Sequence, residues 1–269
     1  ADVGHTRIEE INHLPAVDVE SGADFGWVSM EGSLKTEAFA KGGFDWMTLD
    51  LQHGALTLES ARPLIPVIEA AGVTPIVRVP WNDPPTIMKA LDAGAYGVVV
   101  PLVNTRAEAE QAVWSCRYPP KGGRSFGPAR ASMYGGAGYV DGANDEIAVI
   151  CMIETAEALD NLDEILSVEG VDCAYIGPSD LAYAIGLKPV GDNPDPKHQE
   201  TMLSILEACK RHGVASGAHT GSLEYTTKWL DAGFQMVNLG SDIGFMRASA
   251  STELSAARSQ TDVPPVQDD

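Results

Sequence analysis

Residues 148–155 read Ala-Val-Ile-Cys-Met-Ile-Glu-Thr, an unbroken run of six apolar residues that ends in a carboxylate. So short a run is typical of a β-strand, and its continuous apolar character predicts burial on both faces. Parallel sheets that are covered by helices bury their strands in this way. A helix-like pattern follows over residues 156–166, so this stretch predicts one strand–helix unit of an α/β protein.

The same unit recurs along the chain. Short apolar runs predict eight strands, at residues 25–30, 44–51, 74–79, 97–102, 148–154, 173–176, 214–219 and 235–239. Helix-like patterns predict eight helices, at residues 34–40, 58–71, 84–93, 107–116, 156–166, 198–212, 223–232 and 243–257. Eight such units in 269 residues fit a single-domain (β/α)8 TIM barrel better than an open doubly wound sheet, whose glycine-rich nucleotide fingerprint is missing here.

The barrel is predicted to occupy residues 25–258 as one domain. Residues 1–24 would form an N-terminal extension, and the polar, proline-containing residues 259–269 are expected to be a disordered tail. Two stretches, residues 118–146 and 186–196, interrupt the alternation and are expected to be long loops. The first is rich in Gly, Arg and Tyr, and we interpret it as a segment that covers the mouth of the barrel or contacts another subunit.

The composition narrows the range of partners. The chain has 38 Asp and Glu residues against 18 Lys and Arg, a formal net charge of −20. Nucleic acids and anionic membranes both require clustered positive charge, so neither is an expected partner. A small anionic substrate is not excluded, because one Arg, a metal ion or a helix N-terminus can reverse the sign of the charge inside a single pocket.

The cysteines indicate a reducing compartment. Cys116, Cys151, Cys173 and Cys209 are widely spaced and include no C-x-x-C pair. We interpret them as buried free thiols of a cytoplasmic protein, with disulfides or zinc ligands as the alternatives.

Two carboxylates fall where neighbouring predicted strands end. Glu154 closes its strand, and Asp180 follows the next strand along the chain. The carboxyl ends of barrel strands share one rim, so the two side chains can approach each other, and paired carboxylates suit a hard divalent cation such as Mg²⁺ or Mn²⁺. The alternative is that both residues only cap the helices that follow them.

Other polar side chains fall at the same predicted rim. Arg78 lies within an apolar strand and should therefore meet an anion, either a fixed carboxylate or a substrate. His53 lies three residues after Asp50, close enough for the carboxylate to contact the imidazole and raise its basicity. The alternative is a histidine bound by backbone groups in a tight turn. His219 and Ser241 could also line the mouth, although a structural role is favoured for each.

The positions of the lysines bear on the reaction. No Lys lies within a predicted strand, so a Schiff-base mechanism, which needs a desolvated amine inside the barrel, is disfavoured. Activation of a carbonyl by a metal ion that acts as a Lewis acid is the simpler alternative.

Several ordered motifs resemble one family. They are Gly43-Phe44-Asp45-Trp46 before Asp50 and His53, Arg78 with Trp81-Asn82-Asp83-Pro84, Arg117-Tyr118-Pro119-Pro120, Ile153-Glu154-Thr155, and Gly170-Val171-Asp172 before Ile176-Gly177-Pro178-Ser179-Asp180-Leu181. From residue 25 to its last predicted helix, the chain resembles the HpcH/HpaI aldolases, a family of metal-dependent pyruvate aldolases with a (β/α)8 barrel.

The resemblance implies roles for individual residues. Glu154 and Asp180 would bind a divalent metal, Mg²⁺, Mn²⁺ or Co²⁺, while Arg78 would stabilise the enolate oxygen. His53 would be the acid/base, held by Asp50. The other implied contacts are backbone N–H groups of Ser179 and Asp180 for the substrate carboxylate, the pocket aromatic Trp27, Gln52 where many relatives carry Glu, and Asp92, which would reach a neighbouring subunit's site. The resemblance also implies a hexamer, built as a trimer of dimers, with the last helix packed on a neighbour.

The expected activity is the reversible cleavage of a 4-hydroxy-2-oxo acid to an aldehyde and pyruvate, or a related 2-oxo acid such as hydroxypyruvate, through a metal-bound enolate. Oxaloacetate decarboxylation and lyase action on a CoA thioester are the alternatives among enzymes, because both can use the same enolate chemistry. A catalytically silent barrel that serves as a binding module is the alternative from another class.

Overall fold

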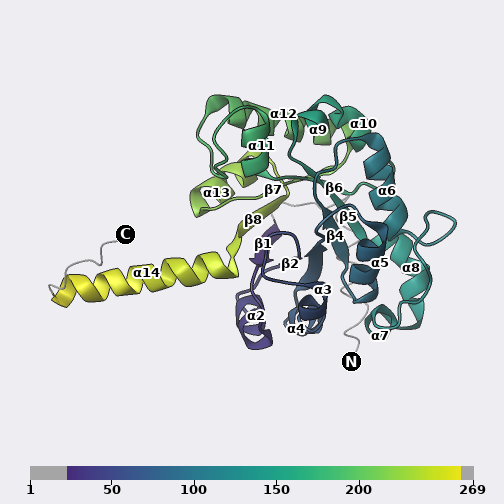
Figure 1. The fold of residues 1–269 in the computed structure, drawn as a ribbon, viewed down its shortest axis with the longest axis horizontal. Coiled ribbons are helices and arrows are strands. Elements are labelled where there is room, and N and C mark those ends of the chain that lie inside the picture. Colours follow the sequence, from purple (N-terminus) through teal and green to yellow (C-terminus); the bar gives the residue numbers. More distant parts are fainter. Residues whose placement is uncertain (1–22, 262–269) are drawn as a thin grey trace.

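Eight parallel strands close into a barrel in which each strand pairs with the next along the chain and β8 pairs with β1 (Figure 1). The computed structural model describes residues 23–261. The strands are β1 (Ala23–Val28), β2 (Trp46–Asp50), β3 (Thr74–Arg78), β4 (Gly97–Val100), β5 (Ala148–Ile153), β6 (Cys173–Ile176), β7 (Ala215–Ala218) and β8 (Met236–Ser241). All eight predicted strands are present, and the single-domain (β/α)8 TIM barrel is confirmed.

Helical segments follow the strands and cover the outside of the barrel (Figure 1). They include α2 (Ser33–Ala40), α3 (Leu58–Ala61), α4 (Ile65–Ala70), α5 (Pro84–Asp92), α6 (Arg106–Cys116), α9 (Ala156–Asp160), α10 (Leu162–Leu166), α11 (Pro178–Ala184), α12 (Pro196–His212), α13 (Leu223–Ala232) and α14 (Asp242–Thr261). The sequence did not predict α11, although a proline at the first helical position, here Pro178, is a known start signal.

Two of the predicted helices are each divided in two. The helix expected at residues 58–71 forms α3 and α4, because Pro63 and Pro66 lack the N–H groups that a continuous helix needs. The helix expected at residues 156–166 forms α9 and α10, which meet at Asn161 with φ of −103° and ψ of 12°.

Residues 118–146 are not the long loop that the sequence predicts. They contain α7 (Ala131–Gly135), the 3-10 turn η1 (Gly136–Gly138) and α8 (Tyr139–Glu146). The many glycines of this stretch concealed its helical character, because Gly is a poor helix former. By contrast, most of the stretch at residues 186–196 has neither helix nor strand, as expected, and α12 begins at its end.

The position of this segment also corrects its expected role. It connects the end of α6 to the start of β5, and therefore lies at the amino-terminal end of the barrel. Arg130 in this segment donates a hydrogen bond to the main-chain oxygen of Ala93, the residue after α5. None of its residues lines the cavity described below. Covering the mouth is therefore the wrong interpretation, and contact with another subunit stays a prediction.

Strand side chains alternate between two apolar clusters, and this alternation positions the site. In β5, Ile150 and Met152 point into the barrel, while the alternate residues Val149, Cys151 and Ile153 pack toward the helices. The alternation carries Glu154, the next residue after β5, inward at the carboxyl end of the barrel. Asp50 and Arg78 reach the same end because they are the last residues of β2 and β3 and lie opposite each other in register.

The described residues test the remaining predictions on the chain as a whole. Barrel strand β1 begins at residue 23, and α14 continues to residue 261, past the expected start of a disordered tail at residue 259. The rest of the expected N-terminal extension and of the tail lies outside the described residues. All four cysteines are buried free thiols, as predicted. No helix in residues 23–261 is long and apolar enough to span a membrane.

Candidate active site

A cavity of about 260 Å³ opens at the carboxyl ends of the strands. Its lining consists of Trp27, Ser29, Asp50, His53, Arg78, Met152, Glu154, Gly177, Pro178, Ser179, Asp180, His219 and Ser241. These residues come from seven strands or strand ends, every one except β4, and nearly all of the predicted site residues are among them. Gln52 and Asp92 are not part of this lining.

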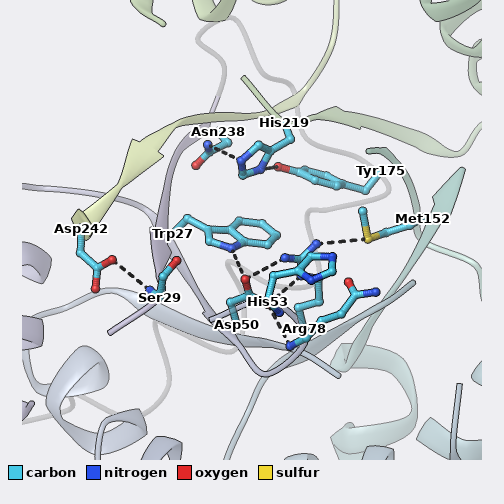
Figure 2. Close-up of polar contacts among 11 residues, drawn as sticks. Trp27, Ser29, Asp50, His53, Arg78, Met152, Tyr175, His219, Asn238 and Asp242 are labelled. Carbon is cyan, nitrogen blue, oxygen red and sulfur yellow. Dashed lines mark hydrogen bonds and ion pairs between the residues drawn. The ribbon is translucent and has the colours of Figure 1, made fainter. Parts of the chain in front are cut away.

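Asp50 and Arg78 form a buried ion pair at the base of the cavity (Figure 2). Arg78 donates from Nε to Oδ1 at 2.9 Å and from Nη2 to Oδ2 at 2.7 Å, a bidentate arrangement. Trp27 adds a third side-chain donor, its Nε1 lying 3.2 Å from Oδ2. Burial alone would raise the pKa of Asp50, but the hydrogen bonds and the charge of Arg78 outweigh it and hold that pKa below its usual value.

The expected contact between Asp50 and the ring of His53 is not formed. Asp50 Oδ1 instead accepts the main-chain N–H groups of Gln52 and His53, at 3.0 and 3.2 Å. Both carboxylate oxygens are therefore occupied by Arg78, Trp27 and the backbone, which leaves no acceptor for the imidazole. Asp50 fixes the turn that carries His53, and the ring itself is exposed at the cavity.

One nitrogen of Arg78 is left over for a ligand. Nη1 lies 4.0 Å from the sulfur of Met152, which is a weak acceptor, whereas the other two guanidinium nitrogens are engaged by Asp50. The guanidinium carbon lies 4.8 Å from the ring centroid of Trp27, a cation–π contact that keeps the group in place. Arg78 therefore meets a fixed carboxylate, one of the two anions predicted for it, and keeps a donor for a substrate oxygen.

Glu154 is a buried carboxylate with no cationic partner among the described residues. Its Oε1 accepts the N–H of Leu102 at 2.9 Å. Burial is the main reason that the pKa of Glu154 is raised to about 7; the charge of Asp180 adds to the increase, and the N–H of Leu102 and the charge of Arg78 offset part of it. On the other side, a Cβ atom at Gly177 would lie 2.1 Å from Oε2, so only glycine fits against this carboxylate.

These two acids are not helix caps. The N-cap of α9 is Thr155, whose side chain accepts the N–H of Ala158, and not Glu154. The N-cap of α11 is Gly177, and Asp180 lies in the first turn without a side-chain capping bond. The capping alternative therefore fails for Glu154, and for Asp180 only a favourable charge at the helix start remains of it.

The residues present fit a divalent cation. Glu154 and Asp180 face one cavity as two carboxylates, and the charge of Asp180 disfavours the ionised form of Glu154 unless a cation lies between them. No group of three or more acidic, His or Cys side chains suited to a metal exists among the described residues. A cation held here would thus keep several positions for water or substrate, which is the usual situation of Mg²⁺.

The start of α11 offers main-chain donors to the same cavity. The first intrahelical hydrogen bond is donated by Leu181 to the oxygen of Gly177, at 2.9 Å. The N–H groups of Ser179 and Asp180 precede it and have no partner inside the helix. These two N–H groups are therefore not occupied by intrahelical hydrogen bonds and can make the predicted contacts to a substrate carboxylate.

His219 is more closely involved in the cavity than its sequence position suggested. Its ring packs edge-on against Trp27 at 4.8 Å, and Nδ1 lies 3.3 Å from the hydroxyl of Tyr175 (Figure 2). Burial and the charge of Arg78 lower the pKa of His219 to about 4, so the ring is neutral at pH 7. Its place at the end of β7 was the sequence signal for a site residue.

Asp242 is a residue that sequence analysis missed. Its buried carboxylate accepts the N–H groups of Ser29 at 3.0 Å and Met30 at 3.2 Å and pairs with Lys35. The contact ties the segment after β1 to the end of β8, and so fixes the wall of the cavity at the seam of the barrel (Figure 2). Its position three residues after the predicted strand at residues 235–239 was the available signal.

Asp92 lies away from the cavity, at the end of α5. Its carboxylate pairs with Arg124 at 2.9 Å, and the Arg124 side chain is fully buried. Within one chain, therefore, Asp92 does not contribute to the cavity, and its contribution to a neighbouring subunit stays a prediction.

The fold and the site together define a (β/α)8 barrel in which acidic, basic and imidazole side chains meet in one cavity at the carboxyl ends of the strands, the usual place of the active site in enzymes of this fold. The model of the HpcH/HpaI aldolase/citrate lyase family matches residues 26–249, and the chain belongs to that family.

Individual relatives agree with this assignment. The chain is 40% identical over 233 residues to a hydroxypyruvate/pyruvate aldolase of Rhizorhabdus wittichii, which covers 87% of this chain and 93% of the relative. It is 36% identical over 238 residues to a 5-keto-4-deoxy-D-glucarate aldolase of Shigella boydii, and this match covers 88% of this chain and 91% of the relative. A crystal structure of a family protein from Burkholderia cenocepacia superposes with a TM-score of 0.86 at 30% identity and covers 93% of this chain and 99% of that one. The chain is thus a carbon–carbon lyase of the aldolase type, and these relatives support a pyruvate aldolase.

Proposed function

We propose that this chain is a divalent-metal-dependent aldolase that reversibly cleaves a 4-hydroxy-2-oxo acid to an aldehyde and pyruvate, or a related 2-oxo acid such as hydroxypyruvate. The observation that carries the proposal is the cavity itself. Two carboxylates that form no ion pair with any described residue, Glu154 and Asp180, share it with one donor of Arg78. The name of the Rhizorhabdus wittichii relative, a hydroxypyruvate/pyruvate aldolase, supports pyruvate and hydroxypyruvate as the 2-oxo acids.

Glu154 and Asp180 would hold the cation, which supplies Lewis-acid stabilisation of the negative charge that develops on the 2-oxo group. Mg²⁺, Mn²⁺ and Co²⁺ are the candidates. The start of α11 binds the substrate carboxylate through the N–H groups of Ser179 and Asp180, because a helix N-terminus favours an anion.

Arg78 acts on the 2-oxo oxygen. When the bond between C3 and C4 breaks, its electron pair moves toward C2 and places negative charge on that oxygen. Nη1 donates a hydrogen bond to it, and Asp50 holds the guanidinium so that no reorganisation is needed at that moment. Protonation at C3 then gives the 2-oxo acid product.

His53 acts at the other end of the bond that breaks. Its imidazole, directly or through a water, removes the proton of the 4-hydroxyl group as C4 becomes the aldehyde carbon. In the direction of addition it returns this proton to the aldehyde oxygen. The exposed ring at the edge of the cavity suits a group that exchanges protons with solvent.

The proposal is tested by pyruvate release from a panel of 4-hydroxy-2-oxo acids, with the protein treated with EDTA and then reloaded with Mg²⁺, Mn²⁺ or Co²⁺. We expect activity only in the reloaded protein. Oxaloacetate decarboxylation without aldol cleavage would indicate an oxaloacetate decarboxylase. Turnover of a CoA thioester without aldol cleavage would indicate a CoA-thioester lyase. Failure of all three reactions would indicate a silent barrel.

We also propose that the chain forms homo-oligomers, as a hexamer built from dimers. Helix α14 extends away from the barrel (Figure 1) and exposes Ile243, Phe245, Met246 and Leu254 to solvent by 41 to 54%. Apolar side chains on a projecting helix support packing on a second copy. In the oligomer Asp92 would approach a neighbouring site.

Four buried free thiols support our placement of the protein in the cytoplasm.

A further inference from the structure

Leu102 has an unusual backbone conformation beside the candidate metal site. Its φ is 54°, and in residues 23–261 no other residue except glycine has a positive φ. The Cβ atom of an L-residue crowds the carbonyl oxygen in this left-handed region, so surrounding contacts must hold a leucine there. The conformation directs the N–H of Leu102 to Oε1 of Glu154, at 2.9 Å. This is the single hydrogen bond that the described residues give to the Glu154 carboxylate.

The side chain of Asn104 holds this conformation. Its Nδ2 donates to the main-chain oxygen of Leu102 at 3.0 Å, and its Oδ1 accepts the hydroxyl of Thr155, the residue after Glu154. The side-chain amide of Asn104 therefore joins the loop that contains Leu102 to the loop that contains Glu154. Asn104 is itself anchored, because its main-chain oxygen accepts Nδ2 of Asn161 at 2.8 Å.

Helix capping does not account for Asn104. The helix that follows it, α6, is capped by Thr105 in a reciprocal capping box with Glu108. The helix after β5, α9, is capped by Thr155. The side chains of Thr105 and Thr155 thus cap the two helices, and the Asn104 amide is not a cap of either one. The two hydrogen bonds of this amide instead fix the geometry around Glu154.

We propose that Asn104 is a positioning residue that acts through the left-handed Leu102 to aim the Glu154 carboxylate into the cavity; this rests on the proposed role of Glu154 as a metal ligand. Without the amide, Leu102 relaxes toward negative φ and its N–H turns away from Oε1. Glu154 then loses the one hydrogen bond that the described residues give to its carboxylate, and the carboxylate is no longer held in one orientation. Hydrogen bonds to metal ligands commonly contribute 10- to 100-fold to affinity.

The experiment measures Mn²⁺ affinity of the full-length, metal-stripped protein by electron paramagnetic resonance, which needs no turnover. Asn104→Ala is expected to bind Mn²⁺ about 10-fold more weakly than the unmodified protein. The matched control is Asn144→Ala, which also loses an amide with two hydrogen bonds, in this case to the backbone of Tyr118 at 2.6 and 3.1 Å, far from the cavity. The control is expected to keep full affinity.

The decisive variant combines Asn104→Ala with Leu102→Gly. Glycine populates positive φ without steric cost, so the double variant should recover most of the lost affinity even though it lacks the amide. Leu102→Val leaves Asn104 in place but disfavours the left-handed conformation, and should weaken Mn²⁺ binding by itself. This variant also keeps the test decisive if Asn104→Ala fails to fold.

The outcomes separate the two proposals. If the unmodified protein does not bind Mn²⁺, or Glu154→Gln binds it normally, the proposed metal site is wrong and this inference falls with it. If Glu154→Gln loses Mn²⁺ while Asn104→Ala and Leu102→Val keep full affinity, the metal site stands and the positioning role is refuted. Loss in Asn104→Ala without recovery in the double variant would refute the route through Leu102.

Discussion

Arg78 and Asp50 are the last residues of neighbouring strands, lie opposite each other in register, and join through two hydrogen bonds of 2.9 and 2.7 Å. The pair fixes the guanidinium plane and directs its remaining nitrogen toward the cavity. The pair also occupies the carboxylate of Asp50, which sequence analysis had expected to contact the imidazole of His53. The histidine and the arginine are therefore separate functional groups, and their roles can be separated by experiment.

The first prediction concerns the metal. Removal of divalent cations with EDTA should abolish aldol cleavage, and Mg²⁺, Mn²⁺ or Co²⁺ should restore it. Glu154→Ala or Asp180→Ala should lose bound metal and at least about 10²-fold in turnover, since Lewis-acid stabilisation is worth several kcal/mol. Circular dichroism should show an intact fold in both. Full activity in protein that elemental analysis shows to be metal-free would contradict the mechanism.

The second prediction concerns Arg78. Arg78→Lys keeps the positive charge but loses the planar fork, so turnover should fall by about 10²-fold, the cost of removing one oxyanion donor. Arg78→Ala should also lower the free energy of unfolding by about 3–5 kcal/mol, because it leaves the buried Asp50 without its partner. Urea denaturation measures the second effect.

A paired substitution separates the two contributions of Arg78. Arg78→Met together with Asp50→Asn removes the uncompensated charge and should recover much of the stability, while turnover stays low. Nearly normal kinetics in Arg78→Ala would show that the arginine only neutralises Asp50.

The third prediction separates His53 from the groups that stabilise the enolate. Loss of a positioned acid/base should slow aldol cleavage by His53→Ala about 10²- to 10⁴-fold. Oxaloacetate decarboxylation, which needs no hydroxyl deprotonation, should survive much better in the same preparation. Glu154→Ala serves as the control that loses both reactions. Equal losses in His53→Ala would mean that the ring supports the cavity and is not the acid/base.

The fourth prediction is a pH dependence of stability. The pKa of His219 is about 4 in the folded chain and near 6.5 when the chain is unfolded. Between these values the unfolded chain binds a proton that the folded chain does not, so the free energy of unfolding falls as the pH is lowered from about 6.5 to about 4. The contribution is at most about 3 kcal/mol for a shift of this size.

His219→Gln isolates this contribution, because the amide keeps polar contacts in the cavity but does not titrate. Chemical denaturation at several pH values should show a shallower decline in the variant. Identical pH profiles would show that His219 titrates normally in the folded protein.

The fifth prediction concerns assembly. Met246→Glu together with Leu254→Glu places two charges on α14, where the side chains are 54% and 50% exposed in the single chain. If α14 packs on a second copy, light scattering after size-exclusion chromatography should show smaller assemblies, because buried unpaired charge is costly. An unchanged molar mass would place the interface elsewhere.

Much of the fold was readable from the sequence because it depends on local pattern. The apolar runs define all eight strands, since a strand buried on both faces needs apolar residues throughout. The helices of residues 118–146 were missed because glycine conceals their pattern, and their stability comes from burial of residues such as Tyr139 and Ala143 against the barrel. Periodicity cannot show such tertiary support.

The sequence by itself also determined which residues reach the rim of the barrel, because strand ends and the two-residue alternation are local properties. Only the tertiary structure decided how these residues pair. Asp50 accepts hydrogen bonds from Arg78, Trp27 and the backbone of His53, and these contacts, which follow from the strand register and the cavity geometry, exclude the imidazole ring of His53. The contact of Leu102 with Glu154 joins residues that are 52 positions apart in the sequence. It depends on a positive φ at Leu102, which the residue type leucine does not predict. Such choices follow from packing across the closed barrel, where groups distant in sequence compete for the same hydrogen-bonding positions.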